Sequence, residues 1–321
     1  MKLLFRRTTP ALLVLSLAMP GSASTCGHPN QLPAQSAQVD ARLDQHSAPP
    51  GYLDESLKQM EKHIPELRGI HASSGEDAVL AAILRKAGER VDEFFSNAID
   101  LVANEQIKQE RDGFGRASVT VKDNYLIVRR GTGPDSDFDE FRMDENGNRL
   151  DRIGLNRGFL VTSGFALICS HLSPAAQWDS RFRYLGEQKI AGRDTYVVAF
   201  SQVPGEATQT ITMSGPRGTA AHILTQGIAW VDQENYHILR MRTDLLAPHP
   251  EIGLDEQTTR VDFREVHLSD LASSLWLPTD VNVYVKLGKI MDRPFEEQFH
   301  NEHHYTNYRH YHVSTKMLAP Q

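Results

Sequence analysis

A two-residue alternation of apolar and polar side chains, running from about Val102 to the C-terminus, sets the narrowest limits on how this chain can fold. It is clearest where Val281, Val283, Val285 and Leu287 alternate with polar or aromatic residues. A period of two is typical of β-strands that bury one face. About ten such segments follow one another through turns, without the helices that parallel strands require between them. The sequence therefore predicts an antiparallel sheet.

Turn residues support this prediction. The dipeptide Asn146-Gly147 favours a two-residue hairpin, because both positions tolerate the positive φ angles of such a turn. Residues 191–194 form a second turn between two alternating segments. Among these strands we find no repeat of about 20 to 50 residues, which disfavours propellers and solenoids.

Three segments depart from the alternation and are predicted to be helical. The longest spans residues 77–101, with Ser74 as a candidate N-cap and Asp77 in its first turn. Its apolar residues recur at spacings of three or four, which predicts one wide apolar face: Val79, Ile83, Ala87, Val91, Phe94, Ala98 and Leu101. A shorter helix is expected within residues 54–67, and the apolar run 164–172 is expected to form a short buried helix.

The N-terminus has the order basic, apolar, small that signal peptidase recognises: Lys2, Arg6 and Arg7 precede the apolar run 11–19. That run is about nine residues long, too short for the roughly 20 that cross a bilayer as a helix. We therefore expect a cleavable signal peptide over residues 1–24 and an exported protein, periplasmic or extracellular, without a transmembrane span. Residues 25–52, rich in Pro, Ser and Gln, are expected to be a disordered linker, and residues 53–318 a single domain.

Charge argues against nucleic acid as a partner. The 34 Lys and Arg residues against 41 Asp and Glu give a formal net charge of −7, and removal of the three basic residues of the signal takes it to −10. An acidic protein of this kind repels phosphate backbones. The 40% hydrophobic content suits a soluble globular domain.

The two cysteines leave alternatives open. Cys26 follows the signal and could be acylated as a lipoprotein N-terminus, but residues 23–25 do not match the preferred small and aliphatic residues of such a site. Cys169 lies in an apolar run, where a thiol usually acts as a small buried hydrophobe, although an oxidising compartment also permits a Cys26–Cys169 disulfide.

Three segments together resemble the lipoprotein-localisation-factor-like (LolA/LolB-type) superfamily and its secreted bacterial relatives. They are residues 184–200, a strand, turn and returning strand; residues 227–242, a hairpin containing Trp230-Val-Asp232; and residues 275–285, which begin Leu-Trp-Leu-Pro. The resemblance implies an open antiparallel β-barrel, or half-barrel, with the N-terminal amphipathic helix as a lid or plug. Such a cover is physically required, because an open barrel leaves an apolar concave face.

We find no pattern typical of a catalytic site. There is no Gly-x-Ser-x-Gly motif, which would indicate a nucleophilic serine. Asp139 and Glu140 are consecutive, so we interpret them as solvated strand residues and not as an acid and a base at working separation. Five histidines lie in the last 22 residues, and His300, Glu302 and His304 share a strand face at a spacing that a transition metal could bridge. We interpret the histidines as the solvated face of a strand, so no metal, cofactor or catalytic residue is predicted.

Arg240 and Arg242 make one face of their strand cationic. We expect them to pair with Asp262 or Glu265 of the next strand, or else to contact an anionic head group. Trp230, Met241 and Phe94 are candidates to line a ligand cavity.

The resulting hypothesis is a non-enzymatic envelope protein that binds or shuttles a lipid, a lipoprotein acyl chain or another amphipathic ligand. The alternatives are an envelope sensor or protein-interaction module, and a secreted hydrolase that uses the His-rich C-terminal strand.

Overall fold

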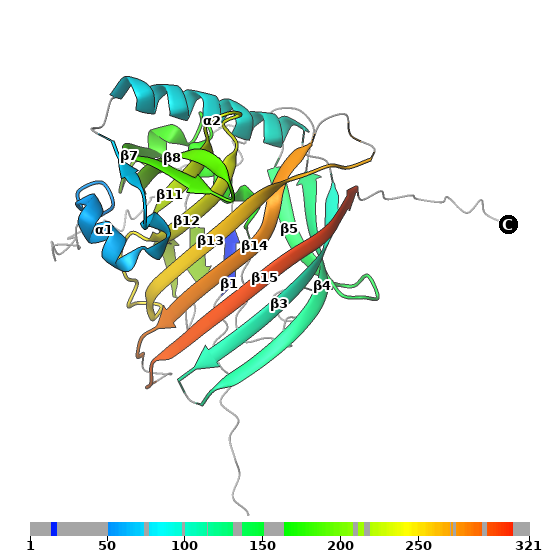
Figure 1. Cartoon of the computed structure of the whole chain (residues 1–321). Coiled ribbons are helices and arrows are strands. Elements are labelled where there is room, and N and C mark those ends of the chain that lie inside the picture. The colour runs from blue at the N-terminus through cyan, green and yellow to red at the C-terminus, as the bar shows by residue number, and fades with distance from the viewer. Residues whose placement is uncertain are drawn as a thin grey trace, which may run out of the picture.

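The computed structural model describes residues 51–73, 77–97, 100–113, 115–130, 137–150, 164–207, 211–214, 219–269, 271, 274–290 and 294–310, and the backbone of residues 14–17. They form two antiparallel sheets of twelve and three strands, with two α-helices (Figure 1). Among these residues, no helix is long and apolar enough to cross a membrane.

The large sheet has the order β2-β7-β8-β11-β12-β13-β14-β15-β3-β4-β5-β6. Its strands are β2 (His71–Ala72), β3 (Leu101–Asp112), β4 (Ala117–Arg130), β5 (Asp137–Met143), β6 (Arg149–Leu150), β7 (Ser180–Ile190), β8 (Arg193–Gln202), β11 (Thr225–Asp232), β12 (Ile238–Leu245), β13 (Leu254–Val266), β14 (Leu275–Leu287) and β15 (Glu297–His310). All neighbours pair antiparallel, and the end strands β2 and β6 do not pair with each other. The predicted open half-barrel is therefore confirmed.

Strand β15 joins the two halves of this sheet. The last described strand pairs on one side with β14 and on the other with β3, nearly two hundred residues earlier in the chain. In Figure 1 the long strands β13, β14, β15, β3 and β4 lie side by side and curve together. The side chains alternate between an inner face, which carries the main core, and an outer face.

The small sheet was not expected. It consists of β9 (Ile211–Ser214) between β10 (Ala220–Ile223) and β1 (Val14–Leu17), and β1 falls inside the apolar run of the expected signal peptide. Met213, Ala221 and Ile223 are buried in the core of the inner face, so this sheet packs on that side.

Helix α2 (Asp77–Asn97) covers part of the inner side. Its buried residues Ile83, Ala87 and Val91 follow the predicted apolar face. It contacts the 3₁₀-helix η2 (Leu167–Leu172) and strand β7, so η2 separates part of it from the sheet. The predicted end at Leu101 is wrong, because Leu101 begins β3 and is fully buried there. The candidate cap Ser74 lies outside the described residues.

Two further predicted helices are present in altered form. The segment 54–67 contains α1 (Leu57–His63) and the 3₁₀-helix η1 (Pro65–Leu67), which are separate because Pro65 lacks the N–H that would continue α1. Both cover the outer face. The buried run 164–172 is confirmed as helical, in the 3₁₀ form of η2, and is followed by the 3₁₀-helix η3 (Gln177–Asp179).

The two predicted turns are also present. Ala191 and Gly192 connect β7 and β8 as a two-residue turn with φ of +48° and +85°. Asn146 and Gly147 lie in the turn between β5 and β6, but the two-residue hairpin predicted there is wrong: residues 144–148 separate the paired strands, and Gly147, at φ +81°, is the one residue among them with a positive φ. Elsewhere a glycine is needed because the backbones of two neighbouring strands approach each other closely. Gly186 lies at a bulge in β7 with φ +142°, and a Cβ there would lie 2.1 Å from the carbonyl oxygen of His71 in β2.

Candidate functional site

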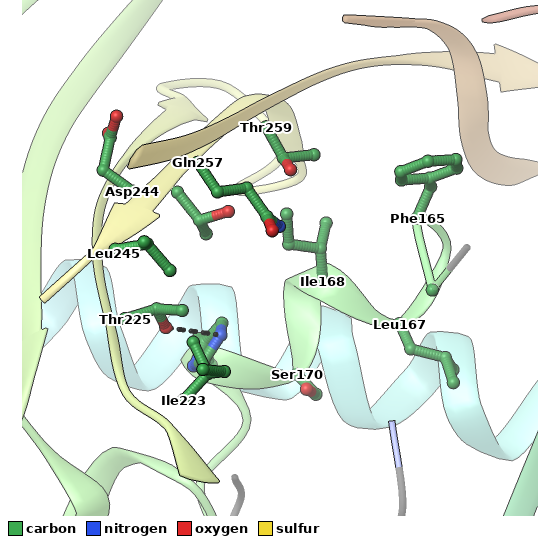
Figure 2. Close-up of a pocket in the computed structure, with 13 residues that line it drawn as sticks. Phe165, Leu167, Ile168, Ser170, Ile223, Thr225, Asp244, Leu245, Gln257 and Thr259 are labelled. Carbon is green, nitrogen blue, oxygen red and sulfur yellow. Dashed lines mark hydrogen bonds between the residues drawn. The ribbon is translucent and has the colours of Figure 1, made fainter. Parts of the chain in front are cut away.

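A pocket of about 40 Å³ lies on the inner face, between the sheet and residues 164–172, which we call the cover segment. Figure 2 shows the side chains around it. The cover segment contributes six lining residues: Gly164, Phe165, Leu167, Ile168, Ser170 and His171. The other lining residues belong to strands β10, β11, β12 and β13: Ile223, Thr225, Thr243, Asp244, Leu245, Gln257 and Thr259. This volume suits a few water molecules, whereas ligand pockets usually measure about 300 to 1,000 Å³.

His171 gives the pocket a polar wall. Its Nε2 lies 3.4 Å from the hydroxyl of Thr225, the contact drawn as a dashed line in Figure 2. Thr225 is held in turn by Gln202, whose Oε1 accepts its N–H at 2.8 Å and its hydroxyl at 3.1 Å. Burial lowers the pKa of His171 to about 4, although Asp179 opposes this change. The imidazole is therefore neutral at pH 7.

Gln257 offers a second polar group. Its side chain reaches the pocket from β13, and its buried Oε1 accepts no hydrogen bond from any described residue. A buried acceptor without a donor costs free energy, so this atom favours a donor inside the pocket.

Glu140 anchors the beginning of the cover segment to β5. Its Oε2 accepts the N–H of Gly164 at 3.0 Å, and its Oε1 accepts the N–H of Leu167 at 3.1 Å. The hydroxyl of Tyr125, on β4, donates to the same carboxylate. Burial raises the pKa of Glu140, while these hydrogen bonds favour the charged form and oppose that effect.

Next to this anchor, the inner face carries a buried ion pair. Arg142 on β5 donates to both oxygens of Glu105 on β3, at 2.5 and 2.7 Å. Glu105 Oε1 also lies 2.9 Å from His303 Nδ1 and accepts the hydroxyl of Tyr305 at 2.7 Å. Phe165 of the cover segment lies edge-on against His303, with ring centroids 4.9 Å apart. The network thus holds His303 in place on the inner face, where the cover segment packs against it.

Charge is compensated inside this network. Burial alone would raise the pKa of Glu105, but Arg142 and His303 outweigh it and lower the pKa to about 2. Burial lowers the pKa of His303, against the effect of Glu105, so this histidine is neutral. One carboxylate and one guanidinium therefore balance each other without solvent.

Neither the described cysteine nor the described metal-ligating residues form a reactive centre. Burial, reinforced by Glu140, raises the pKa of the Cys169 thiol to about 12, so it is a poor nucleophile at pH 7. Cys169 is free and buried, and Cys26, its conceivable disulfide partner, lies outside the described residues. No group of three or more His, Cys, Asp or Glu residues suited to a metal ion occurs in the described part of the chain.

The three predicted cavity residues are not brought together. Met241 is fully buried in the inner core and Phe94 packs against that core, but Trp230 belongs to the outer face, under α1 with Met60 and Ile64. The hairpin register explains the separation: Trp230 pairs with Arg240 and Ala229 with Met241, so Trp230 and Met241 point to opposite faces. Trp230 Nε1 donates to Gln188 Oε1 at 2.7 Å. None of the three lines the pocket.

The C-terminal histidines divide between the two faces. His300 stacks on Tyr284 with centroids 4.1 Å apart, and His304 lies 2.8 Å from Asp280, both on the outer face as predicted. The interpretation of all the histidines as solvated is wrong for His303, which alternates with them and is buried. His312 lies outside the described residues.

Sequence reasoning also misjudged Glu140. It was expected to be solvated beside Asp139, yet the alternation of β5 turns Glu140 and Arg142 to the inner face. Parity along β5 could not have placed them there, because the opposite face carries the apolar Phe141 and Met143. Arg240 behaves as predicted and pairs with Asp262 at 2.5 Å, whereas Arg242 pairs with Asp244 at 2.8 Å and Glu66 at 3.1 Å.

No family model matches this chain, and no curated protein does. Among solved structures, a DUF1329 family protein from Desulfovibrio piger is similar over 72% of this chain and 92% of its own, with 13% identity and a TM-score of 0.34. A domain described as an outer membrane lipoprotein-sorting protein, from Vibrio parahaemolyticus, is similar over 70% of this chain and 91% of its own, with 12% identity and a TM-score of 0.32.

A LolA superfamily protein from Nitrosomonas europaea is similar over 73% of this chain and 94% of its own, with 13% identity and a TM-score of 0.32.

Proposed function

We propose that this protein is an exported, non-enzymatic binding protein of the cell envelope, which takes a lipid, a lipoprotein acyl chain or another amphipathic ligand on its inner face. The observation that carries the proposal is the cover segment: a single short 3₁₀-helix lies over an apolar sheet face and leaves only about 40 Å³ beneath it. In this state the site is closed, and ligand entry requires the cover segment to move.

The contacts of the cover segment suit such a movement. Its polar links to the sheet include the backbone hydrogen bonds to Glu140 and the contact between His171 and Thr225. Short 3₁₀-helices have poorer hydrogen-bond geometry than α-helices, so little internal hydrogen bonding resists a rearrangement. The remaining contacts are apolar packing, and an acyl chain can replace them at comparable free energy because burial of apolar area has no directional requirement.

Native mass spectrometry of the protein purified from its own envelope tests the proposal. We expect an additional mass that organic solvent extracts and that corresponds to an amphipathic molecule. The binding of a fluorescent fatty acyl probe to the purified protein gives a second measurement. If neither a co-purifying amphiphile nor saturable probe binding is found, the proposal is wrong, and capture of a protein without lipid would favour an interaction module instead.

A matched pair of variants locates the site. Gln257→Trp places a large ring in the pocket, while Glu256→Trp places the same ring on the adjacent, exposed position of β13. We expect probe affinity to fall about tenfold or more for the first variant and to stay unchanged for the second. Equal effects of the two substitutions would contradict binding at the inner face.

A further inference from the structure

The charge of Glu140 is balanced differently from that of Glu105, the other carboxylate that anchors the inner face. Glu105 has the guanidinium of Arg142 beside it. Among the described residues, no arginine or lysine pairs with Glu140, whose hydrogen-bond donors are the hydroxyl of Tyr125 and N–H groups of the cover segment: those of Gly164 and Leu167, with a further contribution from Phe165. The ionised form of Glu140 is thus stabilised by neutral dipoles, most of which belong to the segment that must move.

Opening the site therefore changes the surroundings of Glu140. When the cover segment leaves, the carboxylate loses the N–H groups of Gly164, Phe165 and Leu167 and, among its described donors, keeps the hydroxyl of Tyr125. A buried carboxylate that loses its donors must find new ones, take up a proton or face water. Gly164 lines the pocket, so a ligand that replaces the cover segment reaches the same carboxylate.

Of the ionisable groups on this face, Arg142 lies two residues along β5, but its guanidinium is held in the two-point pair with Glu105. The remaining groups that face Glu140 cannot supply a positive charge. They are Tyr125 on β4, Tyr308 on β15 and Cys169 in the cover segment. Burial, with the nearby Glu140, raises the pKa of all three, so they are neutral at pH 7. When Glu140 is ionised, the open site therefore presents a negative charge that none of these described groups compensates.

We propose, resting on the proposed function, that Glu140 selects the ligand: the inner face takes amphiphiles whose head group is an ammonium that donates hydrogen bonds, in place of the N–H groups of the cover segment. The apolar tail covers the surface that Ile168 and Leu167 cover in the closed state. Amphiphiles with an anionic head group are excluded, because they bring a second negative charge to a site of low dielectric constant.

Four probes with the same dodecyl chain separate these contributions. Dodecylamine carries charge and N–H donors, dodecyltrimethylammonium carries charge alone, dodecanoate is anionic, and dodecyl maltoside is neutral. Binding to the full chain is measured below the critical micelle concentration by displacement of a fluorescent acyl probe. We expect dodecylamine to bind about tenfold or more tightly than dodecanoate, with dodecyltrimethylammonium between them, because hydrogen bonds to charged groups are strong.

Variants assign the preference to one residue. Glu140→Gln is expected to remove most of the preference for dodecylamine, and Glu140→Asp to retain a part of it. Glu302→Gln, which removes one negative charge from the half-exposed outer face, is expected to change nothing. Circular dichroism shows whether each variant is folded.

The wild-type protein provides a test that needs no variant. Because burial raises the pKa of Glu140 in the ligand-free protein, the preference for dodecylamine over dodecyl maltoside should begin to decline on acidification at a pH above the pKa of an ordinary carboxyl group.

The outcomes distinguish the two proposals. If dodecyl maltoside binds but dodecanoate binds as tightly as dodecylamine, the head-group selection is wrong while the proposed function stands. A preference that survives both acidification and Glu140→Gln also overturns the selection by Glu140. If none of the four probes binds, the proposed function itself fails, and the head-group selection fails with it.

Discussion

Arg142 and Glu105 form a two-point ion pair across strand β4, with Nε to Oε2 and Nη2 to Oε1 distances of 2.5 and 2.7 Å. Both side chains are almost completely buried. They tie β3 to β5, and Glu105 also holds His303, whose ring contacts Phe165 of the cover segment.

Removing one partner of this pair should be costly. We expect Arg142→Ala to lower the free energy of unfolding by about 3 to 5 kcal/mol, because it leaves the Glu105 charge buried without a partner. The double replacement Glu105→Leu with Arg142→Met should cost clearly less, because no isolated charge remains. Urea unfolding of the three proteins measures both effects. A double variant as unstable as the single one would contradict this explanation.

His171 should make stability depend on pH. Its folded-state pKa of about 4 lies below the ordinary value of 6.5, so the folded protein holds the neutral ring and the unfolded chain takes up a proton first. The stabilisation is complete above pH 6.5 and is lost as the pH falls from 6.5 towards 4, by up to about 3 kcal/mol. Urea unfolding over this range should show a smaller loss for His171→Gln. The control His304→Gln, at an exposed position, should keep the wild-type slope.

Gly186 should tolerate no side chain. A Cβ at this position would lie 2.1 Å from the His71 carbonyl oxygen, and the φ of +142° is itself unfavourable for other residues. We expect Gly186→Ala to lower the free energy of unfolding by about 2 kcal/mol or more, since backbone atoms must shift. Gly192→Ala is the control: it also has positive φ, but a Cβ there would meet nothing within 4 Å. Similar losses in urea unfolding would show that the φ angle alone is responsible.

Trp230 should not respond to a ligand on the inner face. The variant with Trp178→Phe and Trp276→Phe leaves Trp230 as the only tryptophan. Because Trp230 is fully buried under α1, its emission should be blue-shifted, resist quenching by acrylamide and stay constant when an acyl probe binds. In the wild-type protein, quenching should come mainly from Trp178, which is 81% exposed. A ligand-induced change in the Trp230 signal would place the ligand or its effect on the outer face.

The contrast between Trp230 and Met241 shows where sequence reasoning succeeded and where it failed. Both residues lie in strands that the alternation predicted, and the hairpin containing them is present. Which strand face points inward, however, depends on the register with β8 and β13 and on which helix covers which side. Both faces of β11 are buried, so its residues carry no hydrophobic signal that separates inside from outside.

The sequence by itself determined the antiparallel class of the fold, the strand boundaries near Asn146-Gly147 and Ala191-Gly192, the amphipathic helix and the buried run 164–172. Each of these follows from local periodicity or turn chemistry, which neighbouring residues fix. Only the tertiary structure placed Glu140 on the N–H groups of Gly164 and Leu167, and Glu105 between Arg142 and His303. Those contacts join residues 24 to 198 positions apart, and their partners are chosen by strand pairing and packing, which local patterns do not encode.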